Sequence, residues 1–99
     1  MMKQGFSVVV TNWNGMELLP VVLPNIVETA RRTSDKTGLL HEVIVVDDRS
    51  TDGSSDFIRA NFPQILLVEP ETNVGFQGAS NLGFAAAVQP IVVALNNDI

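Results

Sequence analysis

Runs of aliphatic residues alternate along the chain with segments whose apolar residues recur at helical spacing. Uninterrupted runs such as "VIVV" at 43–46 are typical of strands that helices cover on both faces. The predicted strands are residues 6–10, 43–46, 64–69 and 90–99. The predicted helices are residues 17–32, 54–61 and 73–88; we expect Pro24 to kink or delay the first, and Ser54 or Asp52 to cap the second.

This alternation of strands and helices predicts an α/β fold. Strands joined by right-handed helical crossovers lie parallel in one sheet, with helices on its faces. We therefore expect a Rossmann-like three-layer sandwich around a mainly parallel four-stranded sheet, with strand and helix alternating along the whole chain. Gly75, Gly78 and Gly83 lie in the third predicted helix, and we expect them to let that helix pack closely on the sheet.

Composition narrows the classes of protein that fit. The 99 residues are 45% hydrophobic, which suits one globular domain. No run of about 18 apolar residues predicts a membrane span, and the first residues lack the apolar region of a signal peptide. The absence of cysteine excludes thiol chemistry, and the formal net charge of −5 disfavours nucleic acid as a partner. We therefore expect a cytoplasmic protein.

Polar residues cluster where three of the predicted strands end. They are Thr11, Asn12, Trp13 and Asn14 after the first strand, Asp47 and Asp48 after the second, and Asn96, Asn97 and Asp98 in the fourth. The C-terminal ends of parallel strands share one edge of a sheet, and open α/β sheets bind ligands there. An aromatic ring, amides and separated carboxylates at one edge suit a nucleotide with a metal-bound diphosphate.

Individual residues suit particular parts of such a ligand. Trp13 is suited to stack on a base, Asp48 to accept from a ribose hydroxyl or a base N–H, and Asp98 to bind Mg²⁺ or Mn²⁺. Structural alternatives remain open, because a tryptophan such as Trp13, taken alone, is more often a partly buried packing residue, and Asp48 is equally suited to an Asx turn or a helix cap. We expect Asp47 to accept hydrogen bonds from the neighbouring turn.

Four stretches carry a resemblance to a known family: "FSVVVTNWNG", "EVIVVDDRSTDGS", "TNVGFQGASNLGF" and "VVALNNDI". In their order and spacing they resemble the family-2 glycosyltransferases, which are inverting enzymes with the GT-A fold, and in particular the rhamnosyltransferase-like branch. The resemblance covers nearly the whole chain. It implies a domain that binds a nucleotide-diphosphate sugar.

By position, the resemblance implies nucleotide-binding roles for Thr11, Trp13, Asp48, Asn81 and Asn96. Thr11 and Trp13 match residues that contact the base, where Trp13 replaces a more usual tyrosine. Asp48 matches an aspartate that binds the base or the ribose. Asn73 and Gly75, together with Asn81, match the loop and helix beside the sugar-nucleotide.

The resemblance also implies a metal-binding position, and it implies that donor binding and catalysis use different parts of the enzyme. "NND" matches the Asp-x-Asp motif, with Asp98 in the place that binds Mg²⁺ or Mn²⁺ and Asn96 in place of the first aspartate. In the family, the catalytic base is a carboxylate well downstream, in the region that binds the acceptor. We therefore expect residues 1–99 to form the donor-binding half, inactive alone, of an enzyme with a saccharide or lipid-linked acceptor at the inner membrane surface.

Other classes of α/β protein fit less well. A phospho-acceptor receiver domain would have an acidic pair after the first strand, where this chain has "TNWN". A phosphatase of the Asp-x-Asp-x-Thr type would need an acidic residue where Arg49 stands. A non-catalytic nucleotide-binding or interaction module remains an alternative. In either case, an uncovered apolar edge at the fourth strand predicts self-association.

Overall fold

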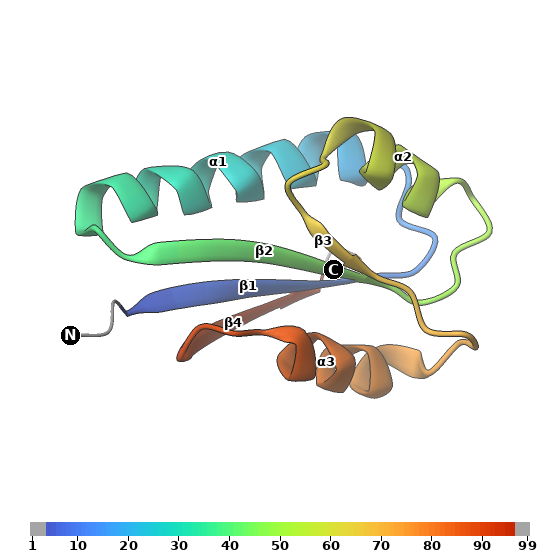
Figure 1. Ribbon diagram of the computed structural model, residues 1–99. Coiled ribbons are helices and arrows are strands. Elements are labelled where there is room, and N and C mark those ends of the chain that lie inside the picture. Colours follow the sequence, from blue (N-terminus) through green and yellow to red (C-terminus); the bar gives the residue numbers. More distant parts are fainter. Residues whose placement is uncertain (1–3, 97–99) are drawn as a thin grey trace.

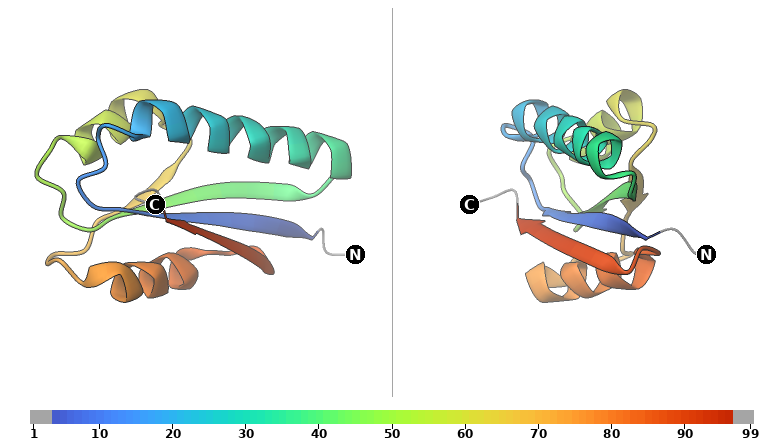
Figure 2. Two further views of the ribbon diagram at one scale, coloured as in Figure 1. Left: turned by 180° about the vertical axis from the view of Figure 1, so that it is seen from behind. Right: turned by 90° about the vertical axis from the view of Figure 1, so that its left-hand side faces the viewer.

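The computed structural model describes residues 4–96, which form a three-layer α/β sandwich (Figure 1). The elements in chain order are β1 (Gly5–Asn12), α1 (Leu19–Thr37), β2 (Leu40–Asp47), α2 (Ser54–Asn61), β3 (Leu66–Val68), α3 (Gly75–Ala86) and β4 (Ile91–Asn96). Figures 1 and 2 show α1 and α2 on one face of the sheet and α3 on the other. The predicted alternation of strands and helices is confirmed.

Every strand pair in the sheet is parallel, and the strand order is β3-β2-β1-β4. The register aligns Asn12 of β1 with Asp47 of β2, and Thr11 of β1 with Asn96 of β4. The C-terminal ends of these three strands therefore share one edge of the sheet, as the sequence predicts. Because β1 and β2 are central, β4 lies at an open edge.

Helix α1 extends beyond its predicted range. It begins at Leu19 and continues through Pro24, so that proline does not delay its start. It ends at Thr37, where Gly38 adopts a left-handed conformation (φ +73°) and donates its N–H to the carbonyl of Ser34 at 2.8 Å. A glycine in that conformation is a common helix end. Among residues 4–96, no helix combines the length and apolarity needed to cross a bilayer.

The remaining elements match their predicted positions, with β3 shortened to three residues. Helix α2 begins at Ser54 as predicted, but Gly53 occupies the N-cap position with φ +88°, so the serine does not cap the helix. Asp52 contributes instead, because its Oδ1 accepts from the backbone N–H of Ser54 at 3.0 Å. That bond satisfies one of the first-turn donors of α2.

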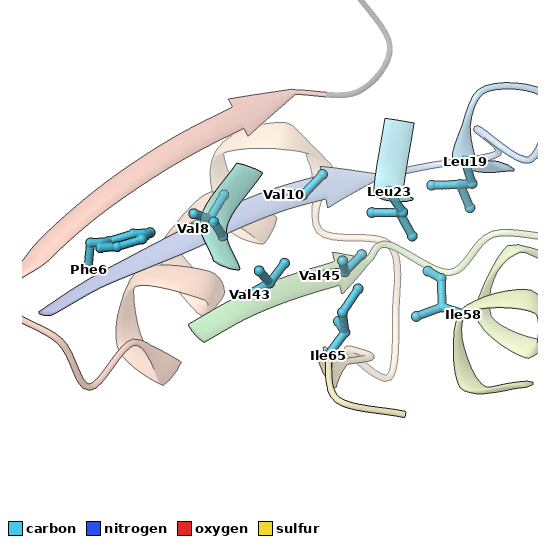
Figure 3. Packing of buried hydrophobic residues seen from close by; sticks show 10 residues of the cluster. Phe6, Val8, Val10, Leu19, Leu23, Val43, Val45, Ile58 and Ile65 are labelled. Carbon is cyan, nitrogen blue, oxygen red and sulfur yellow. The ribbon is translucent and has the colours of Figure 1, made fainter. Parts of the chain in front are cut away.

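The two faces of the sheet carry separate apolar clusters. Alternate residues of a strand point to opposite faces, so β1 and β2 supply both clusters. The larger cluster lies under α1 and α2 (Figure 3) and includes Phe6, Val8, Val10, Leu19, Leu23, Val43, Val45, Ile58 and Ile65. The smaller cluster joins Val9, Ile44 and Val46 to Ala79 of α3.

The glycines of the third helix have different roles. At Gly83 a Cβ would lie 2.2 Å from Val9 Cγ1, so the predicted close packing of α3 on the sheet is confirmed there. At Gly78 an added Cβ would lie 2.8 Å from the Cβ of Val74, the residue just before α3, and not against the sheet. The prediction is wrong for Gly75, which has open space around it and a φ of +77°. That residue serves the backbone turn into α3.

Candidate functional site

A pocket of about 260 Å³ opens at the edge where β1, β2 and β4 end. The strand ends contribute Thr11, Asn12, Trp13, Asp48 and Asn96 to its lining. The loop before α3 and the first turns of that helix contribute Asn73, Gly75, Phe76 and Ala79. The structure therefore places side chains from widely separated parts of the chain around one cavity.

Most of the predicted nucleotide-binding residues meet in this pocket. Thr11, Trp13, Asp48 and Asn96 all contribute to its lining. Asn81 is an exposed residue of α3 and does not belong to the lining. Asp98, the predicted metal ligand, lies outside the described residues.

Thr11 contributes to the pocket lining and carries a buried, unsatisfied hydroxyl. Its side chain is 6% exposed, and Oγ1 has no hydrogen-bond partner within residues 4–96. A buried polar group without a partner costs about 1–3 kcal/mol. A ligand that hydrogen-bonds to this hydroxyl would remove that cost.

Asp48 connects the end of β2 to the start of α3. Its Oδ1 accepts from the N–H of Val74 at 2.7 Å, and its Oδ2 accepts from the N–H of Gly75 at 2.8 Å. Asn73 also donates from Nδ2 to the Asp48 carbonyl at 3.0 Å. A carboxylate at a helix N-terminus is favourable because it meets unpaired donors and the positive end of the helix dipole. Two ionised oxygens offer about four acceptor sites, so Asp48 retains capacity for a ligand.

Asp47 points to the opposite face of the sheet and has its own set of donors. Its Oδ1 accepts from Asn12 Nδ2 at 2.8 Å and from the Ser50 hydroxyl at 2.7 Å, and its Oδ2 accepts from the Ser50 N–H at 3.2 Å. The prediction that this carboxylate binds its neighbouring turn is confirmed. The two adjacent aspartates thus differ in role because successive residues of a strand point to opposite faces of the sheet.

The loop that carries Trp13 is attached to the loop after β2. Asn14, with φ +50°, donates its N–H to Ser50 Oγ at 2.8 Å and accepts at Oδ1 from the N–H of Thr51 at 2.7 Å. Met16 donates its N–H to Asp52 Oδ2 at 2.9 Å. Trp13 itself is 55% exposed, which does not fit a packing role in the core. The hydrogen bonds fix its backbone and leave its ring accessible.

The pKa of Asp52 reflects these contacts. Partial burial raises the pKa of this carboxyl, but the hydrogen bonds from the Ser54 hydroxyl and from the N–H groups of Met16 and Ser54 outweigh it. The net effect places the pKa below the ordinary value. The ionised form of Asp52 is therefore part of the structure that links the two loops.

Two residues of the pocket lining, Phe76 and Ala79, escape the sequence prediction. Phe76 follows Gly75 directly and is 60% exposed, although a phenylalanine in a helix would ordinarily be assigned to the core. One feature of the sequence could have indicated that Phe76 is exposed. It lies in "NVGF", at the start of a helix whose later residues already supply the contacts with the sheet. Nothing in the sequence marks Ala79 as a pocket residue, because an alanine side chain has no polar or aromatic group. It contributes to the pocket lining and also to the packing of α3 on the sheet.

The described residues do not form a complete metal site by themselves. Within residues 4–96 no group of three His, Cys, Asp or Glu side chains is placed to hold an ion. Among those residues, the pocket offers the carboxylate of Asp48 and the amide of Asn96. A metal assignment therefore depends on Asp98.

Solved structures define the class of protein to which this fold belongs. The mannosyltransferase PcManGT from Pyrobaculum calidifontis, in complex with GDP-Man and Mn²⁺, is 30% identical; the match has a TM-score of 0.79 and covers 99% of this chain and 28% of that one. S. aureus TarS in complex with UDP-GlcNAc is 25% identical; that match has a TM-score of 0.77 and covers 96% and 27%. The fold is that of the GT-A glycosyltransferases.

The sequence identifies the family. Residues 7–99 match Glycosyl transferase family 2, and the chain belongs to this family. Undecaprenyl-phosphate 4-deoxy-4-formamido-L-arabinose transferase from Pectobacterium atrosepticum is 34% identical over an alignment of 97 positions, and the match covers 94% of this chain. The chain spans 28% of the length of that relative. The predicted family and fold are confirmed.

Proposed function

We propose that the pocket at the strand ends binds the nucleotide of a nucleotide-diphosphate sugar, and that residues 1–99 form the donor-binding part of a glycosyltransferase. The observation that carries this proposal is the buried, unpaired hydroxyl of Thr11 in the pocket wall. The relatives solved with UDP-GlcNAc and with GDP-Man support the class of ligand.

Each lining residue has a proposed contact. Trp13 stacks on the base, a contact worth about 1–3 kcal/mol in other proteins. Asp48 accepts from a ribose hydroxyl with the acceptor sites that Val74 and Gly75 leave unused. Asn96 offers its amide to the nucleotide. Asn81, exposed on α3 outside the pocket lining, contacts the part of the donor that extends beyond the pocket.

We propose Asp98 as a ligand of Mg²⁺ or Mn²⁺. The relative in complex with GDP-Man and Mn²⁺ supports the use of a divalent ion. Such an ion would neutralise charge on the diphosphate leaving group. With Asn96 in place of the first aspartate, this chain provides a neutral oxygen where an anionic one is usual, so Asp98 carries the metal-binding charge of this motif.

The reaction itself is proposed to need more than these residues. Inverting transfer requires a base for the acceptor hydroxyl, and we place that base outside residues 1–99. The name of the Pectobacterium relative supports a lipid-linked acceptor, and with it a cytoplasmic site at the inner membrane surface for the full-length enzyme. We expect the 99-residue chain to bind donor without transferring its sugar. Detectable transfer by the purified chain, with acceptor supplied, would contradict this.

Nucleotide binding can be tested by thermal unfolding. The chain would be melted with UDP, GDP, dTDP or CMP, each with and without Mn²⁺. A ligand at a hundredfold excess over its Kd stabilises a protein by about 2.7 kcal/mol, which is readily measured. Stabilisation by at least one nucleoside diphosphate is expected. If none of them raises the Tm, the pocket does not bind nucleotides.

Thr11→Val separates ligand binding from folding, because the two effects have opposite signs. Valine keeps the shape of threonine and removes the unpaired hydroxyl, so the free protein should become more stable by about 1 kcal/mol. Nucleotide affinity should fall, because the ligand loses a hydrogen bond worth about 0.5–1.5 kcal/mol. Thr11→Ser, which retains the hydroxyl, is the matched control. A valine variant with unchanged affinity would remove the main support for this site.

We also propose that the β4 edge associates with a second copy of the chain. Ile91, Val93 and Leu95 are 40–48% exposed on the open edge strand. They line an apolar groove of about 510 Å³ between β4 and α1, with Phe6 and Val8 at its floor. An exposed apolar edge with unpaired backbone groups favours pairing with another sheet.

A further inference from the structure

Two large aromatic side chains stand exposed on the same pocket. Trp13 is 55% exposed and comes from the loop after β1, whereas Phe76 is 60% exposed and comes from the first turn of α3. Both contribute to the lining at the strand ends. Single exposed apolar residues are ordinary on protein surfaces, but two aromatic rings on one concave site indicate a contact surface.

One segment, residues 48–51, holds the backbone on both sides. On the Trp13 side, Asn14 donates to the Ser50 hydroxyl at 2.8 Å and accepts from Thr51 at 2.7 Å. On the Phe76 side, the carboxylate of Asp48 binds the preceding N–H groups at 2.7 and 2.8 Å. The backbones that carry the two rings are therefore held relative to each other in the free protein, which lowers the entropy lost when a ligand binds.

Trp13 and Phe76 line the same pocket without packing on each other. Neither Trp13 nor Phe76 makes a ring contact with the other among residues 4–96, where the paired rings are Phe6 with His41 and Phe57 with Phe62. The same lining includes the small side chain of Ala79 and Thr11, whose buried hydroxyl has no partner within residues 4–96. A flat ring with polar atoms on its edge matches a lining with apolar walls and a hydrogen-bonding group.

We propose that Phe76 is the second wall of a slot that contacts a nucleobase on both faces, with Trp13 as the first wall. This inference rests on the proposed function and specifies which part of the donor the pocket recognises. Stacking depends on the face of a base and is tolerant of its identity, so the slot itself accepts purines and pyrimidines. Discrimination between bases then falls to the groups at the ring edge, Thr11 first.

The chain provides its own reporter, because it contains one tryptophan and no tyrosine. Fluorescence excited at the tryptophan band therefore comes from Trp13, and a base stacked on that ring should quench it. UDP and GDP are expected to quench the wild-type protein in a saturable titration. Ribose 5-phosphate, which lacks a base, is expected to leave the emission unchanged.

Phe76→Leu tests the second wall. It removes the ring but keeps an apolar side chain at an exposed position, so the Tm of the free protein should not change. The Kd for UDP and GDP should rise roughly tenfold, as expected from the loss of one base–aromatic contact. Phe76→Tyr, which retains the ring, should keep wild-type affinity. Phe84→Leu is the matched control, because Phe84 is a 44% exposed residue of the same helix outside the pocket lining.

The outcomes separate the two proposals. If UDP and GDP bind the wild type and Phe76→Leu equally well, the two-walled slot is wrong and the nucleotide site stands. If neither nucleotide binds the wild type, the slot that accepts any base is wrong, and if dTDP and CMP also fail to bind, the proposed function fails with it. If calorimetry shows that Phe76→Leu weakens ribose 5-phosphate as much as it weakens UDP, Phe76 contacts a part of the ligand other than the base, and the slot is again wrong.

Discussion

At the scale of single residues, position in the strand decides what each polar group does. Asp47 and Asp48 are neighbours in sequence, yet one binds Ser50 and Asn12 and the other binds the start of α3. The alternation of a strand already predicts that they point to different faces. The partners of Asp48 lie at positions 74 and 75, and no local pattern around the aspartate indicates them.

Gly83→Ala tests how closely α3 approaches the sheet. The new Cβ would lie 2.2 Å from Val9 Cγ1 and 3.2 Å from Val46 Cγ2, so either the helix or the strand must move. Overpacking of this kind costs about 1–3 kcal/mol, which urea unfolding would measure. In a Val9→Ala background the same substitution should cost less, because the obstructing methyl groups are gone. Equal costs in both backgrounds would show that Val9 is not the obstacle.

Arg49 allows a test of backbone strain beside the pocket. It adopts φ +64°, a left-handed conformation that costs a side chain other than glycine about 1–2 kcal/mol. Arg49→Gly and Arg49→Ala both remove the guanidinium, so their difference reports the backbone alone. We expect the glycine variant to unfold at the higher urea concentration, with an advantage of about 1 kcal/mol. A more stable alanine variant would contradict the assigned conformation.

At the scale of elements, hydrophobic periodicity predicts the order and type of all seven helices and strands. Polar composition predicts the end of α1 wrongly. Residues 33–37 are polar and lie outside the predicted helix, yet they complete the exposed face of α1, where Arg31 pairs with Asp35 at 2.8 Å. Apolar spacing identifies the buried stripe of a helix, and the end of that stripe need not be the end of the helix. The pocket shows a similar limit. The residues at the strand ends can be predicted from the sequence, whereas the contribution of Phe76 to the lining depends on where α3 lies in space.

Acid should weaken the link between the loop of Trp13 and the start of α2. The folded pKa of Asp52 is below its ordinary value, and the unfolded value is about 3.9. The stability that ionised Asp52 provides is therefore present above about pH 4 and is lost as the pH falls through the folded pKa. The difference in unfolding free energy between wild type and Asp52→Asn should shrink as the pH falls from 7 towards 2.

Glu28 titrates in the same experiment without affecting the comparison. Hydrogen bonding to Arg31 lowers the pKa of Glu28 to about 2, so this group also contributes to acid sensitivity. It is present in both proteins and cancels in the difference. A gap between wild type and Asp52→Asn that stays constant across the pH range would mean that the Asp52 carboxylate does not support the loop in its ionised form.

At the scale of the whole molecule, the sheet is asymmetric. The β3 side is short, whereas the β4 side presents a full strand of apolar residues to solvent. The main core fills the space under α1 and α2, but the groove between α1 and β4 stays open. The sequence predicts an uncovered apolar edge at the fourth strand, but it does not reveal the groove, which depends on how α1 lies over the sheet.

Val93→Lys tests the proposed association of two copies. A charge in the middle of β4 should disfavour pairing with another sheet. Sedimentation equilibrium of the wild type should show a dimer that dissociates on dilution, and the substitution should weaken it at least roughly tenfold, or about 1.4 kcal/mol. Val21→Lys, at a 65% exposed position of α1, is the control for added charge and should leave the dimer intact. A wild type that stays monomeric at high concentration would refute the proposal.

The hydrogen bonds that shape the pocket rim join residues 25 to 38 positions apart. No short stretch of the chain can assemble that rim before the sheet has formed, so a partly folded molecule lacks the proposed nucleotide site. The saturation point of a tight-ligand titration would therefore count the correctly folded molecules in a preparation. Nucleotide uptake could then serve as an assay of refolding yield, independent of any enzymatic turnover.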